Sequence, residues 1–192
     1  YFVAQFDQEF DDFAGWGKKG DDQSVSFVNP EANIVEGESS GVYVSYNNLK
    51  EGDEVLLKVA ISYVSTENAR MNMKTELSHW DFDRVVGEAS NEWNDYLSRV
   101  KVEGGTEEQR VKLYTDLLRT ASKSIASDVD GSYIDWTGPH PVVRQLPTDN
   151  KGIPIRPFME GDGLWGTQWN LNILWSLIYP EYGNWMAETF LD

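Results

Sequence analysis

The sequence predicts an α+β chain, with strands in its first third and helices in most of the remainder. Four segments rich in Val, Tyr, Phe and Ile show the partial period-two alternation that is typical of strands: 1–6, 24–28, 41–46 and 55–65. Turn-forming residues at 15–17, 29–30, 47–48 and 51–53 separate these segments. After residue 65 the pattern changes, and residues 66–77 are polar and rich in helix formers. Short antiparallel strands at this spacing indicate a β-sandwich.

Two helices are predicted from their caps and their apolar faces. Asp81 is expected to cap a helix that turns one apolar face inward: Phe82, Val85, Val86, Ala89, Trp93 and Leu97. Thr106 and Gln109 have the spacing of a capping box, with Thr106 at the N-cap and Gln109 at N3. The helix that they begin is expected to bury a second apolar set: Val111, Tyr114, Leu117, Leu118 and Ala121.

The last third combines a long irregular stretch with a strongly apolar helix. Residues 127–163 hold five of the seven prolines, and a stretch of this length is usually functional or disordered. Its large apolar side chains, Trp136 and Phe158 among them, argue against disorder. Residues 164–178 are apolar nearly all round, which predicts a buried helix that ends at Pro180.

Composition excludes several classes of partner. The formal net charge of -16 repels phosphate, so we expect no nucleic acid and no anionic membrane surface as partner. No apolar run approaches the roughly 20 residues that span a bilayer, so we expect no membrane insertion. The absence of cysteine excludes disulfides and cysteine-based zinc sites. Eight Trp, nine Tyr and eight Phe suit a large core, and some of them suit stacking against the apolar face of a sugar.

The residues that carry chemistry point to sugar binding more than to metal binding. Glycoside hydrolysis needs two carboxyl groups, and the candidates in the irregular stretch are Asp135, Asp149, Glu160 and Asp162. Glycines flank the last two, which lets a ligand approach the backbone closely. Trp165 and the small and amide side chains after it form either a sugar platform or a helix start whose amides bond the neighbouring backbone.

Metal motifs are weak in this sequence. His79 and His140 have no partner at ligand spacing, and we expect His79 to be structural. Residues 128–131, Asp-Val-Asp-Gly, resemble a calcium loop but lack the downstream acidic ligand. An Asx-turn with Gly131 in a left-handed conformation is the favoured interpretation.

Several segments, taken in order, resemble glycoside hydrolase family 92. Residues 59–69 (VAISYVSTENA) are similar to that family's junction between strand and linker. The segments 93–100 (WNDYLSRV), 102–109 (VEGGTEEQ), 113–115 (LYT) and 127–131 (SDVDG) continue the similarity, and residues 1–4 (YFVA) resemble its late sandwich strands. The resemblance covers essentially the whole chain.

The resemblance implies a calcium-dependent, inverting exo-α-mannosidase, α-1,2-type, bacterial and exported to the periplasm or the exterior. It implies an N-terminal β-sandwich joined to a C-terminal (α/α)6 barrel. On this basis residues 1–65 are the end of the sandwich, 66–102 a helical linker and 103–192 the first barrel helices. We expect the chain to be an internal piece of that enzyme, inactive alone. Its partners would be a glycan substrate and the rest of its own polypeptide, which would supply the catalytic carboxylates and the calcium ligands.

One position departs from the family pattern. The family commonly shows Trp-Asp-Thr followed by Arg, whereas here Gly166 stands between Trp165 and Thr167 and no Arg follows. Trp165 is expected to be an aromatic wall of the sugar site, with Thr167, Asp162 and Glu160 lining it. Two alternatives stay open: a helical-barrel glycosidase or lyase with another sugar, and a noncatalytic carbohydrate-binding protein.

Overall fold

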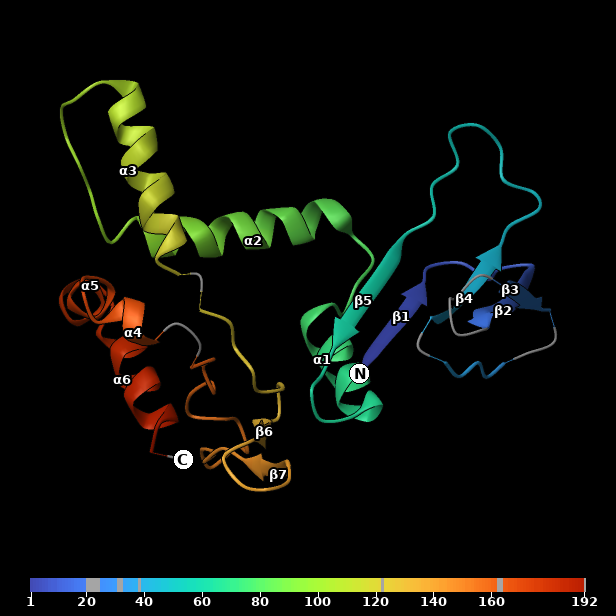
Figure 1. Cartoon of the computed structure of the whole chain (residues 1–192). Helices are drawn as coiled ribbons and strands as arrows, with labels where there is room; N and C mark the ends of the chain where they lie inside the picture. Colours follow the sequence, from blue (N-terminus) through green and yellow to red (C-terminus); the bar gives the residue numbers. More distant parts are fainter. Residues whose placement is uncertain (20–24, 31–32, 38, 122, 162–163, 192) are drawn as a thin grey trace. The chain divides into compact units, whose positions relative to one another are not determined.

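The computed structural model describes the chain except for residues 20–24, 31–32, 38, 122, 162–163 and 192. Strands occupy the first third and helices most of the rest, so the mixed α and β content predicted from the sequence is confirmed (Figure 1). The chain divides into two compact units, one of residues 5–58 and the other of residues 1–4 with 59–192. The predicted boundaries at residues 65 and 102 stay predictions.

The unit of residues 5–58 contains a three-stranded antiparallel sheet. Its central strand β2 (Asp12–Lys19) pairs with β3 (Val25–Asn29) on one side and β4 (Ser40–Ser45) on the other. The turn predicted at 15–17 is wrong, because β2 runs straight through these residues. On the neighbouring strand β4, Gly41 lies opposite Trp16, and a Cβ added to Gly41 would lie 2.8 Å from the indole nitrogen. Only glycine leaves room there for the ring.

A second pair of strands, β1 (Phe2–Phe6) and β5 (Leu57–Ile61), leads into the helices. Helix α1 (Thr66–Glu76) begins at Ser65, whose hydroxyl accepts a hydrogen bond from the Asn68 amide at 3.0 Å. Helix α2 (Phe82–Leu97) begins at Asp81, and helix α3 (Glu107–Arg119) begins at the capping box of Thr106 and Gln109. Both predicted caps are therefore confirmed.

The stretch 127–163 is less irregular than predicted. It contains an antiparallel hairpin of β6 (Ser132–Asp135) and β7 (Val142–Gln145). Two of its later residues contact the C-terminal helix: Arg156, 7% exposed, pairs with Glu188 at 2.8 Å, and the Met159 amide donates to the Thr189 hydroxyl at 3.1 Å. Periodicity over four-residue strands was too short to predict this hairpin.

The single buried helix predicted for 164–178 is wrong in two respects. The chain breaks between α4 (Leu164–Thr167) and α5 (Leu171–Ile178), and α6 (Pro180–Thr189) follows at once, with the proline in its first turn. Among its large side chains whose burial the structure describes, Trp175 alone is fully buried, whereas others are largely exposed: Trp165 77%, Trp169 71%, Ile173 58% and Leu177 77%. An apolar composition alone does not determine which side chains pack against other parts of the chain and become buried.

The core forms where α2, α3, α5 and α6 meet the segment around Met159. Its buried members are Tyr96, Leu117, Met159, Trp175, Tyr179 and Met186. Tyr96 and Tyr179 stack with ring centres 4.1 Å apart, and the Tyr179 hydroxyl donates to the Tyr96 carbonyl. The inward face predicted for α2 is corrected, because Phe82 is 67% exposed and Val86 52%, and Tyr96 is the buried residue of this helix. No helix in the described ranges is long and apolar enough to cross a membrane.

Candidate functional site

A short antiparallel bridge sets the geometry of the candidate site. The Ala126 amide donates to the Phe158 carbonyl at 2.8 Å, and the Glu160 amide donates to the Ser124 carbonyl at 2.9 Å. Ile125 and Met159 face each other between these bonds. Because side chains alternate along extended backbone, Phe158 and Glu160 share one side of the bridge, and Pro157 and Met159 share the other.

A pocket of about 310 Å³ lies on the Phe158 and Glu160 side. We call it the Trp136 pocket, and its lining residues are Tyr63, Ser124, Ile125, Ala126, Ile134, Trp136, Phe158, Glu160 and Gly161. Trp136 and Tyr63 are 71% and 63% exposed, so their rings are open to a ligand. The Glu160 carboxylate makes no hydrogen bond or ion pair with any other described residue. The pocket therefore combines aromatic faces with a carboxylate that can accept hydrogen bonds.

The β6–β7 hairpin holds Trp136 at the edge of this pocket. Tyr133 on β6 stacks on Phe158 with ring centres 4.0 Å apart, which ties the hairpin to the bridge. Asp135 immediately precedes Trp136. Its carboxylate accepts a hydrogen bond from the Thr137 hydroxyl at 2.6 Å and another from Arg144 at 2.6 Å. These bonds, with that from the Thr137 amide, lower the pKa of Asp135 to about 2. A carboxylate held in this way is unsuited to act as a general acid.

This geometry predicts an acid-sensitive hairpin. Because the folded pKa of Asp135 lies below its ordinary value of 3.8, the stabilisation is complete above about pH 4 and is lost as the pH falls through about 2. We expect carbon NMR of the Asp135 carboxyl to give a midpoint near 2. In Arg144→Ala the midpoint should move toward 3.8, and a wild-type midpoint already at 3.8 would contradict the interpretation.

The structure separates the residues that the sequence proposed for the site. Glu160 lines the Trp136 pocket, whereas Trp165 and Thr167 lie on α4 and do not line it. Trp165 is 77% exposed and Thr167 is buried, at 6%. Asp162 lies outside the described residues. Roles for Trp165, Thr167, Asp162 and Glu160 stay predictions.

Of the other candidate groups, most have structural partners. Asp149 accepts from the amides of Lys151 and Ile153, which closes a turn. The Asx-turn at 128–131 is confirmed, because Asp130 accepts from the Ser132 amide and Gly131 has a φ of 85°. Among the described residues no group of three or more His, Asp or Glu side chains is placed to hold a metal ion.

Sequence reasoning missed Tyr63 and the position of Trp136 beside Glu160. In the sequence, Trp136 indicates only that the irregular stretch is ordered. The available signal for Trp136 was the Ile-Asp-Trp run at 134–136, which resembles a strand end. The pairing of 124–126 with 158–160 has no local sequence signature, because it joins residues more than thirty positions apart.

Solved structures share this fold. The structure matches that of the family 92 inverting mannosidase BT2199 from Bacteroides thetaiotaomicron VPI-5482 with a TM-score of 0.72 and 22% identity, over 98% of this chain. It matches the family 92 α-mannosidase BT3965 from Bacteroides thetaiotaomicron with a TM-score of 0.73 and 21% identity, again over 98%. The chain spans 24% of the length of each of these proteins. Among curated proteins there is no match.

Sequence similarity adds the family to the fold. Residues 68–192, more than half of the chain, match the model of the glycosyl hydrolase family 92 catalytic domain. The chain belongs to glycosyl hydrolase family 92. The resemblance noted in the sequence is confirmed.

Proposed function

We propose that the complete protein hydrolyses α-mannosides, the chain described here contributing the Trp136 pocket to its sugar-binding surface. Family membership is the observation that carries this proposal. The two solved relatives are named as mannosidases, one of them inverting. The proposal includes exo action with inversion, α-1,2-type specificity, calcium dependence and a periplasmic or extracellular location. It also includes the architecture in which residues 1–65 end a β-sandwich and residues 103–192 begin an (α/α)6 barrel.

The pocket supports sugar binding without catalysis by its own residues. Trp136 and Tyr63 offer aromatic faces for a pyranose ring, and Glu160 offers an acceptor for its hydroxyl groups. Inversion needs two carboxyl groups roughly 6.5–9.5 Å apart. Glu160 is the single carboxylate among the described residues that line the Trp136 pocket, and we propose that the acid and the base come from elsewhere in the protein. A calcium ion held by other parts of the protein would coordinate hydroxyl groups of the sugar.

Gly166 bears on specificity. It lies exposed on α4, and no described atom lies within 4 Å of a Cβ built onto it. Packing therefore does not require glycine at a position where the family commonly has Asp. The absence of that carboxylate favours weaker binding of mannose or specificity for a different terminal sugar.

The test uses the complete protein and a panel of α-linked mannobioses and other glycosides. We expect release of β-mannose first, as seen by proton NMR, and loss of activity on chelation of calcium. Glu160→Gln and Trp136→Ala should each raise KM about tenfold, because each removes a contact to bound sugar. Asp116→Asn, an exposed carboxylate on α3 that is absent from the pocket lining, is the matched control.

The remaining outcomes separate the alternatives. Cleavage of other glycosides with inert α-mannosides would establish a different helical-barrel glycosidase or lyase. Sugar binding with no cleavage of any substrate would establish a noncatalytic carbohydrate-binding protein. Unchanged KM in both pocket variants would remove the Trp136 pocket from the site.

A further inference from the structure

A second pocket lies on the opposite side of the same bridge. It has a volume of about 210 Å³, and we call it the Trp93 pocket. Its lining comes from α2, α6 and the two bridge segments: Glu92, Trp93, Tyr96, Ala121, Lys123, Ile125, Pro157, Met159, Tyr182 and Trp185. Ile125 lines both pockets, so the bridge is the wall between them.

Aromatic rings form a continuous wall of the Trp93 pocket. Trp93 meets Tyr96 edge to face at 6.1 Å, Tyr96 meets Tyr182 at 5.8 Å, and Tyr182 meets Trp185 at 5.2 Å. Met159, 1% exposed, supplies an apolar floor. Tyr96 and Met159 belong to the core, so this side of the pocket is rigid.

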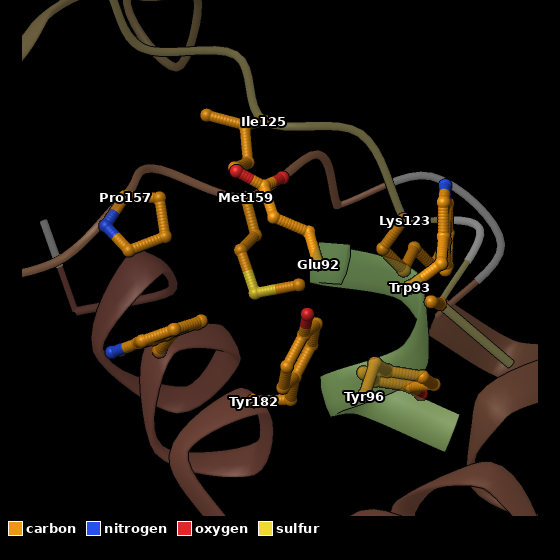
Figure 2. A pocket seen from close by; sticks show the side chains of 10 residues that line it. Glu92, Trp93, Tyr96, Lys123, Ile125, Pro157, Met159 and Tyr182 are labelled. Carbon is orange, nitrogen blue, oxygen red and sulfur yellow. The ribbon is translucent and has the colours of Figure 1, made fainter. Parts of the chain in front are cut away.

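Polar side chains from several elements line the same space. Figure 2 shows the Tyr182 hydroxyl pointing toward Met159, and Glu92 extending from α2 toward Ile125 and Met159. Within the described residues, the side chains of Glu92, Lys123 and Tyr182 make no hydrogen bond or ion pair, and neither does the indole N–H of Trp93 or Trp185. Burial raises the pKa of Tyr182, which keeps its hydroxyl a hydrogen-bond donor.

The charges and the volume narrow the class of ligand. A purely apolar ligand would remove water from Glu92 and Lys123 without replacing its hydrogen bonds. Lys123 disfavours a cation, and Glu92 disfavours an anion. A neutral ring with an apolar face and hydroxyl groups along its edge satisfies the aromatic wall and the polar groups together. The volume lies below the roughly 300–1,000 Å³ typical of pockets for drug-sized ligands, which suits one ring.

We propose that the Trp93 pocket is a saccharide-binding site, separate from the Trp136 pocket, that holds one neutral sugar ring against Trp93 and Trp185. The inference rests on the aromatic wall and the unpaired polar groups, and it does not depend on which bond the complete protein cleaves. The Lys123–Ala126 segment and the Pro157–Glu160 segment form the partition, so a sugar in one pocket does not occupy the other.

The test measures binding of mannose, glucose, galactose and N-acetylglucosamine to the complete protein by calorimetry. Glu160→Gln combined with Trp136→Ala serves as the background, so that the Trp136 pocket is weakened. We expect at least one sugar to keep binding in that background. Glu92→Gln and Trp93→Ala should each weaken this binding about tenfold, and Tyr182→Phe should weaken it measurably. Asp95→Asn, which changes charge in the same way on the same helix outside the pocket, should leave it unchanged.

The outcomes of this binding test are distinct from those of the hydrolysis test of the proposed function. Trp93→Ala touches a core contact, so its thermal unfolding midpoint is measured too, and the exposed Glu92→Gln variant keeps the test valid if Trp93→Ala fails to fold. Loss of all sugar binding in the Trp136-pocket background would overturn the proposal, as would binding of an amino-acid zwitterion but of no sugar. Hydrolysis that persists in Glu92→Gln while this binding weakens would show that the site is separate from catalysis.

Discussion

Replacement of Trp175 by Ala is expected to lower the free energy of unfolding by about 3–5 kcal/mol. Trp175 is fully buried, at 0% exposure, and lies in the core beside Tyr182, with ring centres 6.1 Å apart. Removing the indole leaves a large cavity among rings that cannot all move to fill it. Urea unfolding followed by circular dichroism measures the change.

Two further variants make this prediction specific. Trp175→Phe should cost less than Trp175→Ala, because it keeps an aromatic ring and removes an indole N–H that makes no hydrogen bond to any described residue. Trp136→Ala should change stability by no more than about 0.5 kcal/mol, because Trp136 is 71% exposed. Equal losses in Trp175→Ala and Trp136→Ala would contradict the assignment of Trp175 to the core.

Replacement of Asp128 by Ala is expected to destabilise the protein by about 3 kcal/mol. The Asp128 side chain joins β5 and α1 to the turn before β6: it accepts from the Ser62 hydroxyl at 2.7 Å and from the Asn72 amide group at 2.7 Å. Ser62 and Asn72 are themselves buried, at 4% and 8% exposure. The substitution therefore leaves the Ser62 hydroxyl and the Asn72 amide group without this acceptor, at positions that water reaches poorly.

A double-mutant cycle isolates this network. The double variant Ser62→Ala/Asp128→Ala should lose less free energy of unfolding than the two single variants lose in sum, because each substitution breaks the same hydrogen bond. Asp116→Asn, at an exposed surface pair with Lys112, should be nearly neutral. Strict additivity of the Ser62 and Asp128 changes would show that their hydrogen bond contributes nothing to stability.

Local features of this chain were predictable because their causes are local. Asp81, Thr106 and Gln109 cap helices through bonds to residues three positions away, and Gly131 completes a turn with its immediate neighbours. The family resemblance also came from sequence, because it rests on ordered short segments rather than on contacts. Glu160 stands beside glycines in the sequence and lines the Trp136 pocket in the structure, and its role in a sugar site stays a prediction.

The features that could not be predicted from sequence depend on pairing between distant segments. The strand through Trp16 follows from pairing with two other strands, so Gly15 and Gly17, which resemble a turn in sequence, lie within β2. The pocket walls come from the bridge between Ile125 and Met159. Sequence alone was enough for the caps, the turn at 128–131, the mixed α and β content and the family. Burial and pocket formation depend on which distant segments meet, and no local pattern encodes that choice for Trp175, Trp165 or Trp136.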